Sequence, residues 1–211
     1  MPGWQFTPLP NEALASLPQA SRRYLSETGL PTGIELWMAN IRNLIFTPYS
    51  PQEVHLCGVD YLQIGYSGFT PVFRNLPPNP LAIECASGEV YLLNSLEIAA
   101  DHEGKLPRWF FNSSIEKLVQ SLTTYEKNLP RIEAHNHYVT EREKRLTGLH
   151  DAPLARAIKE LRQHGQRTYG EIRPQIEAID PPAFDSRDKQ SRLWPDTLLE
   201  IRWSSSTPSA D

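Results

Sequence analysis

Four of the six histidines, and an aspartate, fall within one stretch of thirty residues, where they could serve as metal ligands. They are His135, His137, His150 and His164, with Asp151 among them. Zinc needs three or four such side chains converging at about 2 Å. On a helix, however, positions 135 and 137 point about 200° apart, so they cannot share one ion. We therefore expect solvated surface histidines and no metal site.

A second candidate for chemistry is Cys57, which lies two residues from His55 and would pair a thiol nucleophile with a base. Both fall at a predicted junction between a loop and a strand, where a buried and inert cysteine is the commoner arrangement. Asp60 and Glu84 alternate with apolar neighbours, which predicts outward-facing strand residues. The patterns of zinc deaminases, phosphate-binding loops, nucleophile elbows and zinc proteases are missing from the sequence. We therefore expect no catalytic residue, no cofactor and no enzyme.

The clearest signal for an element that positions side chains is the spacing Ser113-x-x-Glu116, a capping box that starts a helix. Five apolar residues follow on one helical stripe: Ile115, Leu118, Val119, Leu122 and Tyr125. We expect this helix to end at Leu129-Pro130, because the residue before a proline is disfavoured in the α region. Upstream, Trp109-Phe110-Phe111 predicts a strand that leads directly into the helix.

The preceding segments predict a sheet. From Leu81 to Leu93, two β-rich runs flank Ser87-Gly88, which suits the turn of a hairpin. Tyr61 to Ile64 predicts a strand that Gly65 ends, and Ile34 to Phe46 is rich enough in apolar residues for one or two more. Near the N-terminus, a short helix is expected with Pro18 as its first residue and Gly29 as its left-handed cap. Clustered strands with flanking helices predict an α+β fold with a largely antiparallel or mixed sheet.

From Arg131 onward the sequence is charged and favours helices. Ile132, Val139 and Leu146 form a thin apolar stripe, a second helix is expected from Asp151 to Gly165, and a third from Tyr169 to Ile179. After Pro181-Pro182, a final helix near 195–201 follows Trp194, which we expect to fill the core. We predict one domain over residues 1–203, with an α+β core at 1–130 and a helical part at 131–203. Residues 204–211 are expected to be a disordered tail.

The charge is concentrated in the first part of the chain. Residues 1–130 carry 12 acidic and 8 basic side chains, whereas residues 131–211 carry 13 of each. This modest negative charge argues against nucleic-acid binding, which needs an excess of lysine and arginine, and it would favour a basic partner. Cys57 and Cys85 lack the spacing of a metal or redox motif, the N-terminus MPGWQFTPLP does not read as a leader, and no apolar run is long enough to span a membrane. We expect a reduced cytoplasmic protein.

Several short motifs occur in an order that resembles the SUKH superfamily, and most closely its fourth subfamily of bacterial immunity proteins. They are the helix that runs into Gly29-Leu30-Pro31, the strand that ends at Ile64-Gly65, the hairpin with Gly88-Glu89-Val90-Tyr91, the corner Asn112-Ser113-Ser114, and the closing Leu193-Trp194-Pro195. Each motif is structural when it is taken alone, because the glycines suit turns, the serine suits a cap and the tryptophan suits a core. Their order and spacing carry the resemblance.

The resemblance implies a protein that binds a cognate toxin domain, commonly a nuclease or a nucleic-acid deaminase, and inhibits it stoichiometrically. Partner-binding surfaces vary within such a family, so no interface residue is transferred. We expect Glu97, Asp101 and Glu103, in the loop after the hairpin, to form an acidic patch that meets a basic toxin surface. The alternative function is an intracellular protein-binding scaffold, as in eukaryotic relatives of the SMI/KNR type. The oligomeric state stays open.

Overall fold

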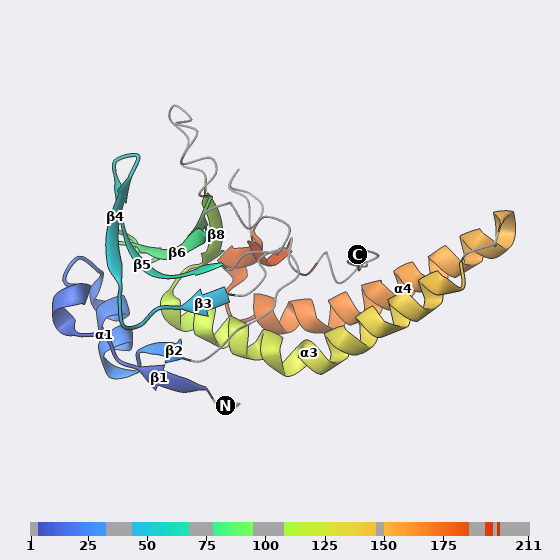
Figure 1. Ribbon diagram of the computed structural model, residues 1–211, viewed down its shortest axis with the longest axis horizontal. Helices are drawn as coiled ribbons and strands as arrows, with labels where there is room; N and C mark the ends of the chain where they lie inside the picture. Colours follow the sequence, from blue (N-terminus) through green and yellow to red (C-terminus); the bar gives the residue numbers. More distant parts are fainter. Residues whose placement is uncertain are drawn as a thin grey trace.

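A β-rich body carries a long helical hairpin that extends away from it (Figure 1). The computed structural model describes residues 4–32, 44–67, 78–94, 108–146, 150–185, 193–195 and 198. All strand pairs in this part of the chain are antiparallel. The predicted α+β class is therefore confirmed. Glu97, Asp101 and Glu103, and the tail 204–211, lie outside the described residues.

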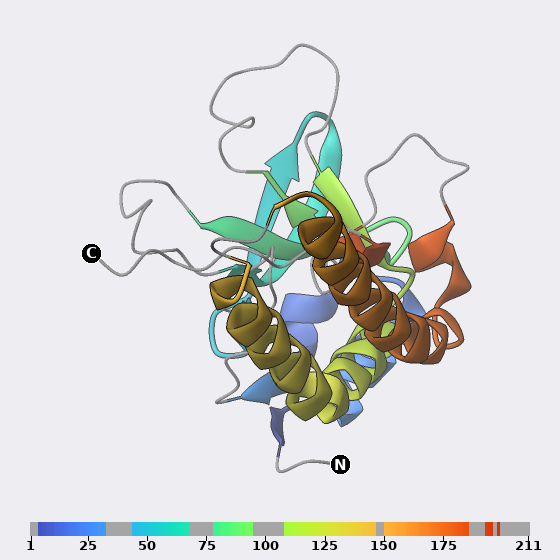
Figure 2. The same ribbon diagram turned by 90° about the vertical axis from the view of Figure 1, so that its right-hand side faces the viewer.

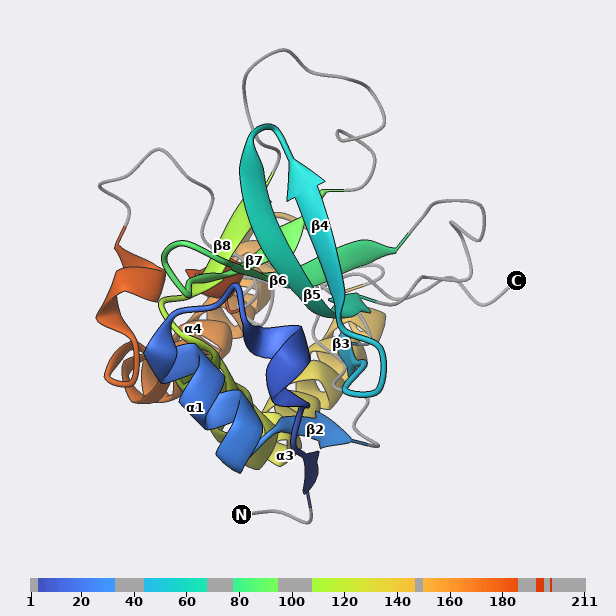
Figure 3. The same ribbon diagram turned by 90° about the vertical axis from the view of Figure 1, so that its left-hand side faces the viewer.

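The main sheet is organised around β5, which pairs with three other strands. Its strands are β3 (Leu44–Phe46), β4 (Gln52–Leu56), β5 (Val59–Ser67), β6 (Asn79–Glu84), β7 (Val90–Leu93) and β8 (Arg108–Asn112). The order is β3-β5-β6-β7-β8, and β4 also pairs with β5. The first half of β5 pairs with β4 and its second half with β3, while β6 lies along its other edge. The β4–β5 hairpin therefore projects beyond the rest of the sheet (Figure 3).

Gly65 does not end its strand, contrary to the prediction. The strand continues to Ser67, and the register between β5 and β6 shifts between Gln63 and Gly65. A Cβ atom at position 65 would lie 2.3 Å from the carbonyl oxygen of Ile45 on β3. The glycine therefore permits a close approach of two backbones, which is the other common reason for glycine inside a strand.

The other predicted strands agree with the structure where it is described. The hairpin from Leu81 to Leu93 is confirmed as β6 and β7, with Gly88 at φ +79° in the turn. Trp109-Phe110-Phe111 is confirmed within β8. Of the segment 34–46, the described part contains β3, and residues 34–43 lie outside the described residues.

The N-terminal segment forms a small unit beside the sheet. It contains the two-stranded sheet of β1 (Gln5–Thr7) and β2 (Leu30–Thr32), the short helix η1 (Asn11–Leu14) and α1 (Gln19–Glu27). Pro18 is the N-cap of α1 rather than its first helical residue. The left-handed cap at Gly29 is confirmed, with φ +90°. A Cβ at Gly29 would lie 2.1 Å from the carbonyl oxygen of Thr7, so this residue also lets β1 and β2 approach each other.

Two long helices form the hairpin that leaves the body. They are α3 (Ile115–Lys144) and α4 (Asp151–Glu177), and they run side by side (Figure 2). The predicted helix ends at Leu129-Pro130 and at Gly165 were wrong, and the separate helix predicted from Tyr169 is part of α4. Residue 130, the predicted boundary of the core, lies inside α3.

Contacts between the helices explain why neither Pro130 nor Gly165 ends its helix. On either side of Pro130, Asn128 donates to Gln175 at 3.3 Å and Arg131 pairs with Glu171 at 3.0 Å. These contacts hold both sides of the proline against α4, so the loss of one backbone hydrogen bond is tolerated. Gly165 is buried, as a small residue in a helix interface is expected to be. Packing thus outweighs the intrinsic preference of both residues.

The first turn of α3 differs from the prediction by one residue. Ser114, not Ser113, is the N-cap, and its hydroxyl accepts from the Lys117 amide at 3.3 Å. The apolar stripe is confirmed, because all five of its residues are buried: Ile115, Leu118, Val119, Leu122 and Tyr125.

The last described segment returns to the body. After η3 (Pro181–Phe184), residues 193–195 and 198 are helical. Trp194 is fully buried and its ring lies 5.4 Å from Phe111 and 5.9 Å from Tyr125. The prediction that Trp194 fills the core is confirmed.

Candidate functional site

A buried polar cluster joins β8, the start of α3, the segment that follows α4 and the C-terminal segment. We call it the Asp180 node, formed by Asn112, Ser113, Lys117, Asp180 and Trp194. Asp180 is fully buried, and its Oδ2 accepts from Asn112 Nδ2 at 3.0 Å and from the Ser113 amide at 2.6 Å. Its Oδ1 accepts from Ser113 Oγ at 2.7 Å and from Lys117 Nζ at 3.3 Å. Trp194 Nε1 donates to Asn112 Oδ1 at 2.9 Å.

The node is structural rather than catalytic. Both carboxylate oxygens are engaged by donors, and a buried charge with such partners is stabilised in place. Ser113 is held by Asp180, which explains why the next residue, Ser114, caps α3. The sequence did not single out Asp180, because the partners that identify it lie 63 to 68 residues away along the chain.

The β4–β5 hairpin carries the predicted thiol and base candidates. His55 Nδ1 lies 2.6 Å from Asp60 Oδ1, and both side chains are exposed. Cys57 is exposed at φ +48° in the hairpin turn, so the expectation of a buried cysteine was wrong. The reason is local, because Cys57-Gly58 forms the two-residue turn and Gly58 also has a positive φ. Asp60 faces outward, as predicted.

A cavity of about 270 Å³ lies beside the His55–Asp60 pair. It is lined by Ser16, Glu53, Val54, His55, Asp60, Tyr61 and Cys85. The Cys85 thiol lies 3.5 Å from Ser16 Oγ, and burial raises the pKa of this thiol. A thiol with a raised pKa is a poor nucleophile at neutral pH. The cavity thus offers an acidic, partly apolar surface and no activated nucleophile among the described residues.

Arg108 ties four strands together next to this cavity. Its guanidinium lies 4.0 Å over the Tyr91 ring, 2.6 Å from the Tyr61 hydroxyl and 3.4 Å from Glu84 Oε1. Burial raises the pKa of both tyrosines, so their phenols stay neutral. Glu84 is half-buried and paired with Arg108, so the prediction that it faces outward was wrong. The cluster stabilises the sheet and leaves no free acid or base.

We call the part of the α3–α4 hairpin that extends away from the body the arm. Its histidines lie in different environments. His135 is buried against α4, contrary to the expectation of a surface residue, while His137 on the opposite side of α3 is exposed. The Nδ1 atoms of His135 and His164 are 2.8 Å apart, and the two rings stack at 5.0 Å. The Tyr138 ring also stacks on His164, with 4.2 Å between the ring centroids.

This arrangement is a hydrogen bond between two rings, so one Nδ1 donates and the other accepts. His150 precedes α4 as its N-cap and is exposed. Within the described residues, no three histidine, cysteine, aspartate or glutamate side chains gather as a metal ion would require. The same part of the chain contains no helix that is both long and apolar enough to cross a membrane.

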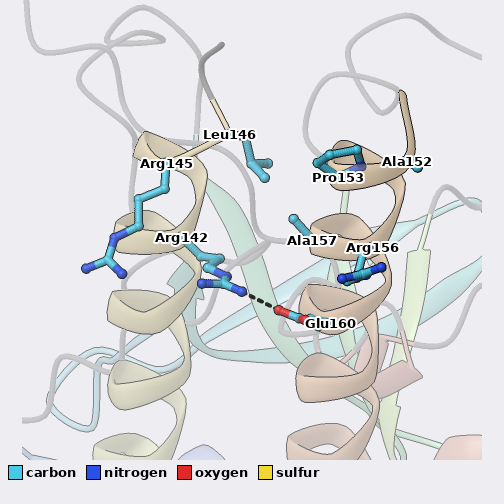
Figure 4. Close-up of a pocket in the computed structure, with 8 residues that line it drawn as sticks. All are labelled: Arg142, Arg145, Leu146, Ala152, Pro153, Arg156, Ala157 and Glu160. Atoms are coloured by element: carbon cyan, nitrogen blue, oxygen red, sulfur yellow. Dashed lines mark hydrogen bonds and ion pairs between the residues drawn. The ribbon is translucent and has the colours of Figure 1, made fainter. Parts of the chain in front are cut away.

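The far end of the arm contains a second cavity, of about 250 Å³, between the last turns of α3 and the first turns of α4. We call it the arginine pocket, and Figure 4 shows its lining: Arg142, Arg145, Leu146, Ala152, Pro153, Arg156, Ala157 and Glu160. Arg142 forms an ion pair with Glu160 across the two helices. Three arginines and a small apolar surface thus line a cavity at the end of the helical hairpin most distant from the sheet (Figure 1), with the Arg145 side chain extending on the side of α3 away from α4 (Figure 4).

These features define an α+β protein in which the buried polar clusters are structural, while concave surfaces are available on the β4–β5 hairpin and at the end of the arm. A model of the family described as SUKH-4 immunity protein matches residues 6–200, and the chain belongs to this family. The resemblance inferred from the short motifs is thereby confirmed. Searches of the curated proteins and of the solved structures gave no match.

Proposed function

We propose that this protein neutralises a cognate toxin domain by binding it in a stoichiometric complex that occludes or locks the toxin. Membership in the SUKH-4 immunity protein family, over residues 6–200, carries the proposal. The site chemistry supports binding rather than catalysis, because Asp180 and Arg108 are committed to internal partners and Cys85 is held as a thiol. We therefore propose that the protein is not an enzyme and that it acts in the cytoplasm.

We propose a nuclease or a nucleic-acid deaminase as the toxin. Such proteins bind a polyanion and so carry basic surfaces, and this chain has a net charge of −4. Opposite charges accelerate association and favour the correct partner. A tight complex of this kind buries about 1,600 Å² in total. We further propose that residues 1–203 act as one domain, in which α3 continues across the predicted boundary between the core at 1–130 and the helical part at 131–203.

The acidic residues Glu97, Asp101 and Glu103 remain our proposed contact with a basic toxin surface. Replacing them together by Gln, Asn and Gln is expected to slow association more than it speeds dissociation, since exposed charges act mainly on the on-rate. Stopped-flow measurements at several salt concentrations test this. A salt dependence of the on-rate that does not change in the triple variant would rule out this patch.

The function itself is tested by a pull-down of the tagged full-length protein from its native cells and their close relatives, followed by mass spectrometry. Each recovered toxin domain is then co-expressed with this protein. We expect one domain whose lethality is abolished at an equimolar level of this chain. Recovery of several housekeeping proteins without any rescue would contradict the immunity role and favour an intracellular scaffold.

A further inference from the structure

The arginine pocket combines concavity, apolar surface and positive charge at the end of an exposed arm. Leu146, from the end of α3, and Pro153, from the start of α4, line it together with Ala157, which is buried. Figure 4 shows that Leu146 and Ala157 extend into the space between the two helices and that Arg142 reaches across it to Glu160. The pocket is therefore built by both helices and depends on their mutual position.

The positive charge in this pocket exceeds what its own acid can neutralise. Glu160 is committed to Arg142. Arg145 and Arg156 are exposed, and neither forms an ion pair with another described residue. In addition, Nε of Arg142 is shielded from solvent and has no hydrogen-bond partner within the described part of the chain. A buried donor without an acceptor is unfavourable, and the guanidinium groups that a ligand can reach are those of the exposed Arg145 and Arg156.

We propose that the arginine pocket receives an acidic side chain of the partner protein, with the carboxylate bound by the guanidinium groups and the adjoining chain packed on the apolar surface. This inference rests on the proposed immunity function and names a second contact on the toxin. Guanidinium groups bind carboxylates through two parallel hydrogen bonds, which adds geometric selectivity to charge attraction. Arginine is also one of the residues that contribute most often to binding energy in protein interfaces.

The surroundings favour a carboxylate over an extended polyanion. Glu141 and Glu143 lie on the same turns of α3, and Glu160 lines the pocket itself. A nucleic acid carries a charge on every nucleotide and would meet these carboxylates next to the arginines. A single acidic side chain can bind in the pocket without bringing further negative charges close to these carboxylates. The partner is therefore expected to present isolated acidic residues to the arm, while a basic surface faces the body of this protein.

The pocket can be tested with a defined probe on the full-length protein. Arginine side-chain NMR signals are followed while a capped alanine hexapeptide that contains one glutamate is added. The same peptide with glutamine in place of the glutamate is the uncharged control, and oligothymidylate is the polyanion control. The Arg145→Gln/Arg156→Gln double variant is compared with Arg22→Gln, an exposed arginine on α1, which lies at the end of the molecule opposite the tip of the arm (Figure 1). We expect the double variant to bind the glutamate peptide about five- to tenfold more weakly, and Arg22→Gln to bind as the unchanged protein does.

Other outcomes of the probe experiment would overturn the inference. They are equal binding of the glutamine peptide, tighter binding of oligothymidylate than of the glutamate peptide, or equal weakening in Arg22→Gln. A variant that keeps the charge, Arg145→Lys/Arg156→Lys, should retain part of the affinity, because a lysine provides the charge without the two-pronged geometry.

The same double variant separates this inference from the proposed function. If a toxin is recovered and neutralised by the unchanged protein, its dissociation constant should rise about five- to tenfold with the double variant and stay constant with Arg22→Gln. A toxin that binds the double variant with unchanged affinity would overturn the pocket as a contact and leave the immunity function intact. If no toxin is neutralised by the unchanged protein, the immunity function itself fails.

Discussion

Asp180 is a buried carboxylate whose four hydrogen-bonding contacts come from β8 and the start of α3. A buried charge is tolerated only when its oxygens are satisfied, and removing one partner leaves the others desolvated and unpaired. The same residue determines which serine caps α3, because Ser113 is engaged and Ser114 is free to accept from the Lys117 amide. A single side chain thus sets both a helix boundary and the position of the C-terminal segment.

Replacing Asp180 by alanine is expected to lower the free energy of unfolding by about 3–5 kcal/mol, since it leaves the amide and the hydroxyl of Ser113 without their acceptor and removes one of the two acceptors of Asn112 Nδ2 and of Lys117 Nζ. Urea unfolding followed by circular dichroism measures the change. The matched control is Glu27→Ala, which removes an exposed ion pair with Arg23 and should change stability by about 0.5 kcal/mol or less. Similar losses in the two variants would contradict a structural role for the node.

The His135–His164 contact predicts a pH dependence of stability. Burial, with a further contribution from Arg167, lowers the pKa of His164, and His135 and Tyr138 face it from α3. The unfolded chain regains a pKa of about 6.5 and so binds the proton more readily than the folded chain. The contribution of His164 to the free energy of unfolding is therefore complete above about pH 6.5 and is lost as the pH falls through the lowered pKa.

Urea unfolding at several pH values between 7 and 5 measures this effect. In His164→Asn the decline towards low pH should be smaller than in the unchanged protein, whereas His137→Asn, at an exposed position on α3, should keep the full decline. An identical pH dependence in all three proteins would show that the contact does not titrate with folding.

At the scale of elements, the strands around the β6–β7 hairpin and the start of α3 were predictable, whereas β1, β2, β4 and the full length of the two long helices were not. The turn at Ser87-Gly88, the β-rich run from Tyr61 to Ile64 and the aromatic run Trp109-Phe110-Phe111 are local signals. The structure confirms them as a hairpin and as parts of β5 and β8. The breaks predicted at Pro130 and Gly165 follow from local preferences that contacts such as Arg131–Glu171 override. Those two residues are 40 positions apart, so no window along the sequence brings them together. The Asp180 node and the arginine pocket were not predicted for the same reason, because each is formed by residues from segments that are separated in the sequence.

Gly29 offers a test at the same scale, because it ends α1 and also permits a close approach to β1. Gly29→Ala combines a positive φ with a Cβ placed 2.1 Å from Thr7 O, whereas Gly58→Ala has a positive φ and nothing within 4 Å. The first variant should lose clearly more than about 2 kcal/mol of stability and the second about 1 kcal/mol. Thermal unfolding measures both, and equal losses would show that the close approach relaxes at little cost.

At the scale of the whole molecule, the protein combines a tightly packed body with an arm that is buried along one side only. The central strands β6 and β7 are buried over most of their length, with β7 buried throughout. In the described part of the arm, the buried apolar residue of α3 beyond Asn136 is Val139, and that of the first turns of α4 is Ala157. The surface proposed for recognition therefore lies where the packing is weakest.

Hydrogen exchange followed by mass spectrometry should show this difference. Amides in the outer arm, from residue 137 to 146 and from 152 to 163, are expected to exchange well before those of β6 and β7, since local opening there exposes little apolar surface. Addition of the toxin that this protein neutralises should slow exchange in the outer arm if the arginine pocket contacts the toxin. Exchange that is equally slow in the arm and in the sheet would contradict this division.

The order in which the chain is synthesised determines when the Asp180 node can form. Asn112 and Ser113 leave the ribosome 67 or more residues before Asp180, and Asn112 leaves it 82 residues before Trp194. Until these late residues emerge, Phe111 and Tyr125 lack the indole that covers them and Ser113 lacks its acceptor. A nascent chain that has already completed its sheet thus still presents an apolar opening, and translation of its last segment is the step that closes the fold.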